Sequence, residues 1–308
     1  MIITLTPNTG IDFTLQLSSF QLNSTIRAVD SAWGMGGKAT DASWTLGKIG
    51  VSSRALGFAA GPNGRRMESM LRARGVITDF VQVDGETRLN TVIVLPDEGQ
   101  STITSASLRV SSQHLDEFSV RYEKALEGAS CVVMGGSLPQ GVPLDFYAEA
   151  IHQAHAYGVP VIFDSSGPSL ITGVKSRPDL IKPNLVELGE LLGYQPASKE
   201  EARNAACRLR DEYGTDVIVT LGAEGAIAVT GEAAFFVHPI SLPVVSSAGA
   251  GDGVLAGMAL AYSRRESFEY GLQHGFALAG AILQTLATAD LRVEDYQELL
   301  SQICITQL

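Results

Sequence analysis

Short apolar runs alternate with longer amphipathic segments through most of the chain. The runs consist of consecutive apolar residues, many of them β-branched, which is typical of strands buried on both faces. They cover residues 2–5, 53–58, 131–135, 160–164, 180–182, 216–220 and 226–230. Helical spacing predicts helices over residues 39–50, 64–74, 144–157, 184–192, 199–213, 252–264 and 268–286. This alternation predicts a mostly parallel sheet with helices on both faces.

Two stretches, about 12–33 and 87–107, depart from the alternation and show period-two patterning. Residues 96–99, Pro-Asp-Glu-Gly, have the composition of a hairpin turn. We interpret both stretches as one small antiparallel sheet, inserted twice into a single domain that spans residues 1–308. Such a sheet would form a lid over the carboxyl ends of the parallel strands, where open α/β sheets bind ligands. The alternative is an edge hairpin without a ligand role.

Composition and charge narrow the class of protein. The chain has 308 residues, 45% of them hydrophobic and 18% charged, as in a soluble globular enzyme. The net charge is −11 and basic runs are lacking, which argues against nucleic acid or an anionic membrane surface as the main partner. Three scattered cysteines, a strand-like N-terminus and the lack of a long apolar run favour a cytoplasmic location.

The most informative motif lies at residues 248–253, Ala-Gly-Ala-Gly-Asp-Gly, directly before a predicted helix. Small residues there let backbone N–H groups and the helix dipole bind an anion. Asp252 lies inside this turn, where a carboxylate suits a general base beside a transferring phosphoryl group. The alternative is a glycine-rich helix cap.

A second glycine cluster precedes another predicted helix. Gly36 and Gly37 let the backbone approach a small polyol, while Lys38 meets a negative charge. The cluster lacks the spacing of a Walker A loop. A tight turn with an exposed lysine is the alternative.

A third cluster follows the strand at 180–182. Asn184 and Glu187 lie on one face of the next helix and offer oxygens that suit Mg²⁺ or its water shell. Asn184 as a helix N-cap with Glu187 in the first turn is the equally good alternative.

The order of these three clusters resembles the ribokinase (PfkB) family of carbohydrate kinases over almost the whole chain. The resemblance implies a ribokinase-like three-layer α/β/α sandwich. Residues 6–12, 85–90 and 136–139 resemble the family's phosphofructokinase branch, which phosphorylates fructose 1-phosphate, tagatose 6-phosphate or fructose 6-phosphate. The activity implied is ATP-dependent transfer to a sugar phosphate, with Mg²⁺ as cofactor and Asp252 as base.

The resemblance also implies roles for single residues. Gly249, Ala250 and Gly251 would form an anion hole, and Asn184 and Glu187 would organise Mg²⁺. The residues implied for ATP binding are Lys182, Asn184, Thr220, Gly222 and Gly225. Those implied for the acceptor are Asp12 for sugar hydroxyls, Lys38, Arg88 and Asn90 for the existing phosphate, with Gly36, Gly37, Asp41 and Ser137 nearby. Arg27 in the lid would add a charge, in one version across the interface of a homodimer formed through the lid.

Two departures from the family pattern fall on the acceptor side. Ala39 stands where the family has a glycine, and Asp41 stands where it has an amide. A carboxylate there disfavours a nearby phosphate and favours hydroxyl-rich groups. A kinase for an unphosphorylated sugar or nucleoside therefore remains an alternative, although Arg88 argues against it. A catalytically inactive sugar or nucleotide sensor is the alternative from another class.

Overall fold

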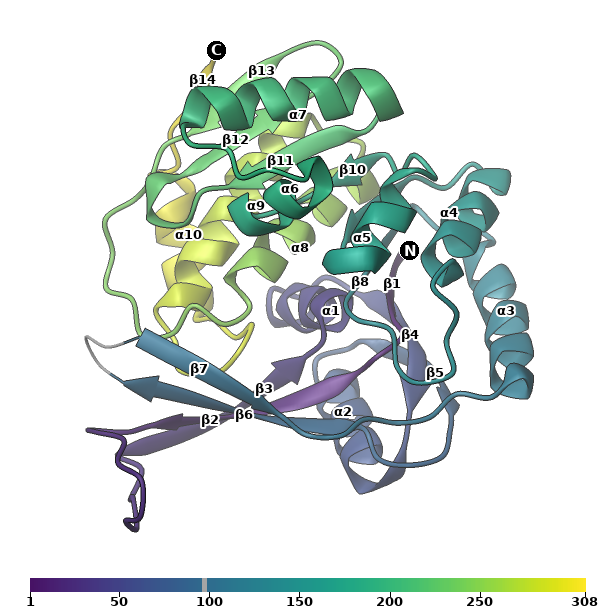
Figure 1. The fold of residues 1–308 in the computed structure, drawn as a ribbon, viewed down its shortest axis with the longest axis vertical. Helices are drawn as coiled ribbons and strands as arrows, with labels where there is room; N and C mark the ends of the chain where they lie inside the picture. Colours follow the sequence, from purple (N-terminus) through teal and green to yellow (C-terminus); the bar gives the residue numbers. More distant parts are fainter. Residues whose placement is uncertain (96–98) are drawn as a thin grey trace.

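The computed structural model describes residues 1–95 and 99–308, which form one ten-stranded sheet with helices around it and a second, smaller sheet (Figure 1). The large sheet has, in spatial order, the strands β14 (Ile305–Gln307), β13 (Ala234–Val237), β12 (Ala226–Val229), β11 (Asp216–Thr220), β10 (Leu180–Ile181), β9 (Val161–Asp164), β8 (Cys131–Gly135), β1 (Ile2–Thr6), β4 (Ser53–Ala59) and β5 (Ile77–Gln82). The pairs from β11 to β5 are parallel. The pairs from β11 to β14 are antiparallel. The prediction of a mostly parallel sheet is confirmed.

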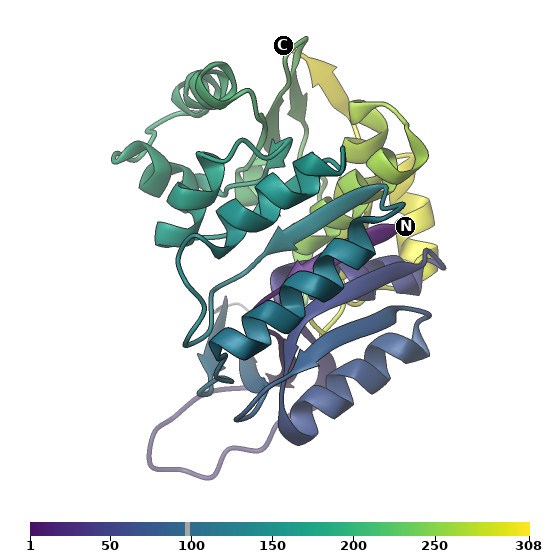
Figure 2. The same cartoon turned by 90° about the vertical axis from the view of Figure 1, so that its right-hand side faces the viewer.

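Helices cover both faces of this sheet, as predicted, and Figure 2 shows the teal and the yellow-green helices on opposite sides of the strands. One layer contains α3 (Ser112–Leu126), α4 (Phe146–Ala156), α5 (Gly167–Val174), α6 (Leu185–Leu192) and α7 (Lys199–Tyr213). The other contains α1 (Lys38–Lys48), α8 (Ala250–Arg264), α9 (Phe268–Leu283) and α10 (Val293–Leu300). Side chains along β1 point to opposite faces of the sheet in turn. Ile3 and Leu5 therefore pack in the core under the first helix layer, and Ile2 packs in the core under the second. The result is a three-layer sandwich.

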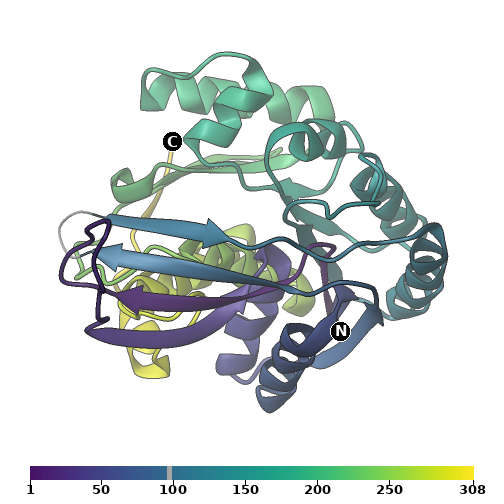
Figure 3. The same ribbon diagram turned by 60° about the horizontal axis from the view of Figure 1, so that its bottom comes forward.

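The smaller sheet is the lid, and its strand order is β3 (Asp30–Gly36), β2 (Gly10–Gln16), β6 (Arg88–Leu95) and β7 (Gly99–Thr104) (Figure 3). The prediction that it would be antiparallel holds for its outer pairs only. β2 and β6 run parallel, because each enters the lid from the carboxyl end of a parallel strand, β1 or β5. The lid is therefore a mixed sheet. The predicted turn at 96–99 lies mostly outside the described residues.

A third core cluster joins the lid to the main sheet through α2 (Gly61–Ala73). Met67 and Leu71 of this helix pack with Ile11 of β2 and Met35 of β3. The lid strands are thus anchored at the end that lies nearest to the large sheet. This anchoring fixes the positions of residues at the start of β2 and β6, which include several of the predicted site residues.

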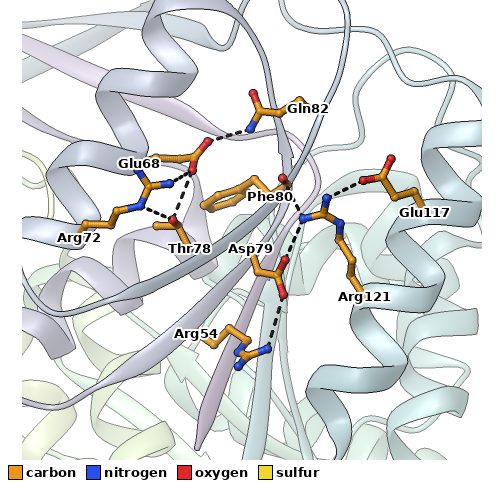
Figure 4. A network of polar contacts seen from close by, with 9 residues as sticks. All are labelled: Arg54, Glu68, Arg72, Thr78, Asp79, Phe80, Gln82, Glu117 and Arg121. Carbon is orange, nitrogen blue, oxygen red and sulfur yellow. Dashed lines mark hydrogen bonds and ion pairs between the residues drawn. The ribbon is translucent and has the colours of Figure 1, made fainter.

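Polar contacts tie the edge strand β5 to its neighbours (Figure 4). Asp79 pairs with Arg121 of α3 at 2.9 Å and with Arg54 of β4 at 3.5 Å. Glu68 of α2 accepts a hydrogen bond from Gln82 at 2.8 Å and also pairs with Arg72. Charged side chains of this kind discourage pairing of an exposed strand edge with another chain.

Candidate active site

The predicted site residues gather at the carboxyl ends of the parallel strands. Asp164 is the last residue of β9, Lys182 follows β10 and Thr220 ends β11. The helices α1 and α8 begin at the same edge, and their first turns bring Lys38 and Asp252 close to these strand ends. Open α/β sheets bind their ligands at this edge.

The turn before α8 has the features of an anion site. Gly249 has a φ of 82°, and a Cβ at this position would overlap the backbone of Ala289. Glycine alone satisfies both conditions. No side chain among the described residues caps this helix end, so neither Asp252 nor a neighbour consumes the first-turn N–H groups in the way a cap does. The N–H groups of Ala250 and Asp252 donate to the backbone carbonyls of Ser247 at 3.4 Å and Gly249 at 3.0 Å. The positive end of the helix dipole lies at this edge of the sheet and favours an anion there.

Asp252 lies in the first turn of α8 and is only 9% exposed. Burial raises the pKa of this carboxyl to about 7, and the negative charge of Asp164 adds to the rise. Lys38 and Lys182 oppose it by stabilising the ionised form. A carboxyl with a pKa near neutrality matches the requirement for a general base.

Two lysines and two carboxylates form a cluster beside Asp252, in which Asp164 and Lys182 are buried and Lys38 is partly accessible. Asp164 pairs with both lysines: its Oδ1 lies 2.9 Å from Lys38 Nζ, and its Oδ2 lies 3.1 Å from Lys182 Nζ. Lys38 also contacts Glu187 at 3.3 Å. Burial opposes the ionisation of Asp164, but Lys182 and Lys38 outweigh it and the pKa of Asp164 is lowered. Asp164 was not among the predicted site residues, although its place at the end of a strand on the ligand edge is the signal that points to it.

The acceptor side is formed by the starts of the lid strands. Asp12 of β2 and Asn90 of β6 are direct partners in the parallel register, and Asn90 Nδ2 donates to Asp12 Oδ1 at 2.7 Å. A Cβ at Gly36 would overlap this same Oδ1, so the third strand must carry a glycine there. Burial raises the pKa of Asp12, while Asn90 and Arg88 lower it. The predicted set Asp12, Gly36, Arg88 and Asn90 is thus brought together.

Other acceptor-side predictions are placed differently. Lys38 was expected to act with Arg88 and Asn90, whereas its amine here pairs with Asp164 and Glu187. Ser137 lies at the end of β8 and accepts a hydrogen bond from Asn8 at 2.9 Å. Arg27 lies exposed in the loop between β2 and β3, and no hydrogen bond joins it to the site residues in the described part of the chain. The role of Arg27 stays a prediction.

The nucleotide-side predictions share one wall of the site. Asn184 precedes α6 and forms a backbone bridge with Thr220 of β11. Thr220 leads into the short 3₁₀ helix η1 (Gly222–Glu224), which ends at Gly225. A Cβ at Gly251 would lie 3.1 Å from Lys182 Nζ, so this lysine is beside the predicted anion hole. The segment after β10, which contains Lys182 and Asn184, therefore lies next to the glycine-rich turn before α8.

The capping alternative for Asn184 and Glu187 holds in this structure. Asn184 Oδ1 accepts hydrogen bonds from the N–H groups of Val186 and Glu187, and Glu187 Oε2 accepts one from the N–H of Asn184. Both residues are thus engaged by protein atoms, and no group of three or more metal-ligating side chains is found among residues 1–95 and 99–308. The remaining lone pairs of the Glu187 carboxylate fit a hydrated Mg²⁺ held through its water shell, which is how this ion is often bound beside phosphates.

Comparison with known proteins agrees with this geometry. Residues 8–294 match the pfkB family carbohydrate kinases. A 1-phosphofructokinase of Bacillus subtilis is 31% identical over 313 positions and is covered completely, as is this chain. The chain belongs to the pfkB family of carbohydrate kinases, which are enzymes that use ATP.

Solved structures of the same family superpose over nearly the full length. A possible 1-phosphofructokinase from Thermotoga maritima has a TM-score of 0.89 at 26% identity, with 100% of this chain and 99% of that chain covered. The phosphofructokinase-2 of Escherichia coli in complex with potassium has a TM-score of 0.87 at 27% identity, with 98% of each chain covered. The ribokinase-like fold predicted from the sequence is confirmed. No helix in the described part of the chain is long and apolar enough to cross a membrane.

Proposed function

We propose that the protein transfers the γ-phosphoryl group of ATP to a hydroxyl of a sugar phosphate of the fructose 1-phosphate, tagatose 6-phosphate or fructose 6-phosphate type. The observation that supports this most directly is the position of Asp252. Its carboxyl is buried in the first turn of α8, directly after the glycine turn at 249–251, and it contacts Asp41, which in turn lies near Asp12 of the acceptor side. A base at this point reaches an acceptor hydroxyl and a phosphoryl group at the same time.

The chemistry proposed is a direct in-line transfer. Asp252 takes the proton of the acceptor hydroxyl as the hydroxyl oxygen attacks the γ-phosphorus, and the bond between this phosphorus and the bridging oxygen of ADP breaks. The N–H groups of Gly249, Ala250 and Gly251 stabilise charge on the equatorial oxygens. Lys182, beside Gly251, adds a positive charge on the nucleotide side. When bound, Mg²⁺ would neutralise phosphate charge, held through water by Glu187 with Asn184 positioning that residue.

The acceptor's own phosphate is assigned to Arg88. The Nε of Arg88 is buried and has no partner among the described residues, which is a costly state for a polar group unless a ligand completes it. Asp12 and Asn90 then hold sugar hydroxyls, and the backbone at Gly36 and Gly37 lets the sugar approach closely. Lys38 is assigned to the reacting phosphoryl group rather than to the acceptor's phosphate, because it is paired within the Asp164 cluster next to Asp252.

A panel of acceptors tests this proposal. With Mg-ATP present, ADP release is measured with fructose 1-phosphate, fructose 6-phosphate, tagatose 6-phosphate, fructose, ribose and a nucleoside. We expect turnover only with phosphorylated ketohexoses, and at least a tenfold loss of kcat/KM in Arg88→Met, as removal of a charged hydrogen bond predicts. Turnover only with unphosphorylated acceptors would support the alternative acceptor class. A complete lack of turnover with any acceptor would favour a sensor.

The lid is joined to the segment before the anion site by one side chain. Gln100 of β7 accepts hydrogen bonds from Ser246 Oγ at 3.0 Å and from the N–H of Ser247 at 2.9 Å. Ser246 Oγ in turn accepts from the N–H of Ala248 at 3.3 Å. A chain of hydrogen bonds therefore links the lid to the residue that precedes Gly249.

We expect Gln100→Ala to lower kcat for transfer about tenfold, the loss that two hydrogen bonds predict, and to raise the share of ATP hydrolysed by water. A lid that closes poorly excludes less water from the site. The measurement compares ADP formed with sugar product formed. Ser101→Ala is the matched control, because adjacent strand residues face opposite sides of the sheet. An unchanged ratio of ADP to product in Gln100→Ala would contradict this role.

A homodimer through the lid stays a prediction. Phe20, Leu22 and Val29 are exposed in the loop between β2 and β3, as is Ile103 on β7. Exposed apolar side chains on a lid offer a contact for a second copy. A solution mass measured by light scattering tests it, and a monomer at every concentration would contradict it.

A further inference from the structure

Asp41 is a buried carboxyl in direct contact with the predicted base. It lies in the first turn of α1 and is 4% exposed. Its side chain hydrogen-bonds the carboxyl of Asp252. Two ionised carboxylates have no proton to share, so a hydrogen bond between them requires that one be protonated. The contact therefore implies a single proton held by the pair.

The charges around the pair favour this proton. The cations on α1 and after β10, Lys38 and Lys182, are already paired with Asp164. Glu187 of α6 engages Lys38 as well. On the lid side, Arg88 of β6 faces Asp12 of β2, and Tyr147 of α4 lies near Arg88. Five carboxyls, Asp12, Asp41, Asp164, Glu187 and Asp252, thus face three cations, Lys38, Lys182 and Arg88, which leaves an excess of negative charge that a proton relieves.

Asp41 is the member of the pair that holds the proton. Burial raises its pKa well above the ordinary value, and the charges of Asp252 and Asp12 raise it further. Asp252 lies nearer the two lysines, which favour its ionised form. The protonated Asp41 then donates through one oxygen to the Asp252 carboxylate. Asp41 Oδ1 is buried and receives no hydrogen bond from a donor group among the described residues, so the side chain has accepting capacity to spare.

We propose that Asp41 acts as a neutral carboxylic acid that positions Asp252 by donating a hydrogen bond to it, while its carboxyl group also accepts a hydrogen bond from a hydroxyl of the acceptor. This inference rests on the proposed kinase function. A neutral carboxylic acid offers one donor and one acceptor, as an amide does. The carboxyl that stands in place of the family's amide therefore adds no charge, and it does not repel an acceptor that carries a phosphate. The expectation that Asp41 would disfavour a phosphate presumed an ionised side chain.

Infrared difference spectroscopy tests the protonation without any need for activity. The spectrum of wild-type protein minus that of Asp41→Asn, at pH 8 and without ligands, should contain the C=O stretch of a protonated carboxyl. Its absence would overturn the proposal even if the protein is an active sugar-phosphate kinase. Its presence in a protein that phosphorylates no acceptor would support the protonated pair while the proposed function failed. Thermal unfolding of the variant verifies that it is folded.

The positioning role is tested by the pH dependence of kcat and kcat/KM. Activity of the wild type requires Asp41 protonated and Asp252 ionised, so both constants should fall at high pH as Asp41 loses its proton. Asp41→Asn keeps a donor toward Asp252 and cannot ionise, so we expect it to lack the high-pH decrease. Asp41→Ala has neither donor nor acceptor and should have a kcat at least tenfold below that of Asp41→Asn. A high-pH decrease that is the same in Asp41→Asn, or equal losses in both variants at every pH, would overturn the positioning role.

Discussion

Asp252→Asn should lower kcat by a factor of about a thousand to ten thousand while ATP affinity changes little. The amide has nearly the shape of the carboxyl but accepts no proton, and general base catalysis contributes up to about ten-thousandfold in enzymes. The site keeps its glycine turn and Lys182, so nucleotide binding is retained. Initial rates of ADP release and equilibrium binding of ATP measure the two effects separately.

Asp211→Asn is the control for this substitution, because Asp211 lies exposed on α7, away from the strand ends. It should leave kcat and ATP affinity unchanged. A full rate in Asp252→Asn would show that the proton goes elsewhere and would remove the main support for the proposed mechanism. Loss of ATP affinity together with the rate would assign a structural rather than a chemical role to Asp252.

The parts of the site that depend on local sequence could be predicted from the sequence. The glycine turn at 249–251 needs a residue with left-handed backbone angles and close backbone packing. Both requirements select glycine or alanine, and the sequence shows these residue types directly. Asn184 and Glu187 lie three residues apart, so their shared helix face follows from the period of the helix. The strands with continuous apolar runs were predicted for the same reason, since burial on both faces determines their composition.

The parts that depend on long-range pairing could not be predicted in this way. Asp164 pairs with Lys38, which is 126 positions away in the sequence, and with Lys182, which follows a neighbouring strand. The sequence around an aspartate at a strand end does not reveal such distant partners. The parallel pairing of β2 and β6 follows from how both strands leave the main sheet, not from their patterning. The helices α3, α5 and α10 and the strands β5, β13 and β14 were not predicted. Buried residues recur at helical spacing in α3, at Phe118, Tyr122, Ala125 and Leu126, so this helix could have been found from its pattern. The strands β13 and β14 have only four and three residues, which is too short for a clear pattern.

The partners of Asp164 lead to the second large expected effect, which concerns stability. Asp164→Asn should lower the free energy of unfolding by about 3 kcal/mol or more, because it leaves the buried Lys182 without its counter-charge. Urea unfolding at neutral pH, without ligands, measures the change. The pKa of Asp164 is lowered in the folded protein, so its stabilisation is present above the ordinary value of 3.8. The difference between wild type and variant should therefore shrink as the pH falls below that value.

Asp79→Asn provides the matched comparison. Asp79 also pairs with two cations, Arg54 and Arg121, but at the exposed edge of the sheet, where its side chain is 26% accessible (Figure 4). Water screens this pair, so the loss should stay below about 1 kcal/mol. The double variant Asp164→Asn, Lys182→Met removes both partners and should recover part of the lost stability, since a buried pair replaced as a whole costs less than one broken pair. Equal losses at Asp164 and Asp79, or no recovery in the double variant, would mean that the lysines are neutralised in some other way than by Asp164.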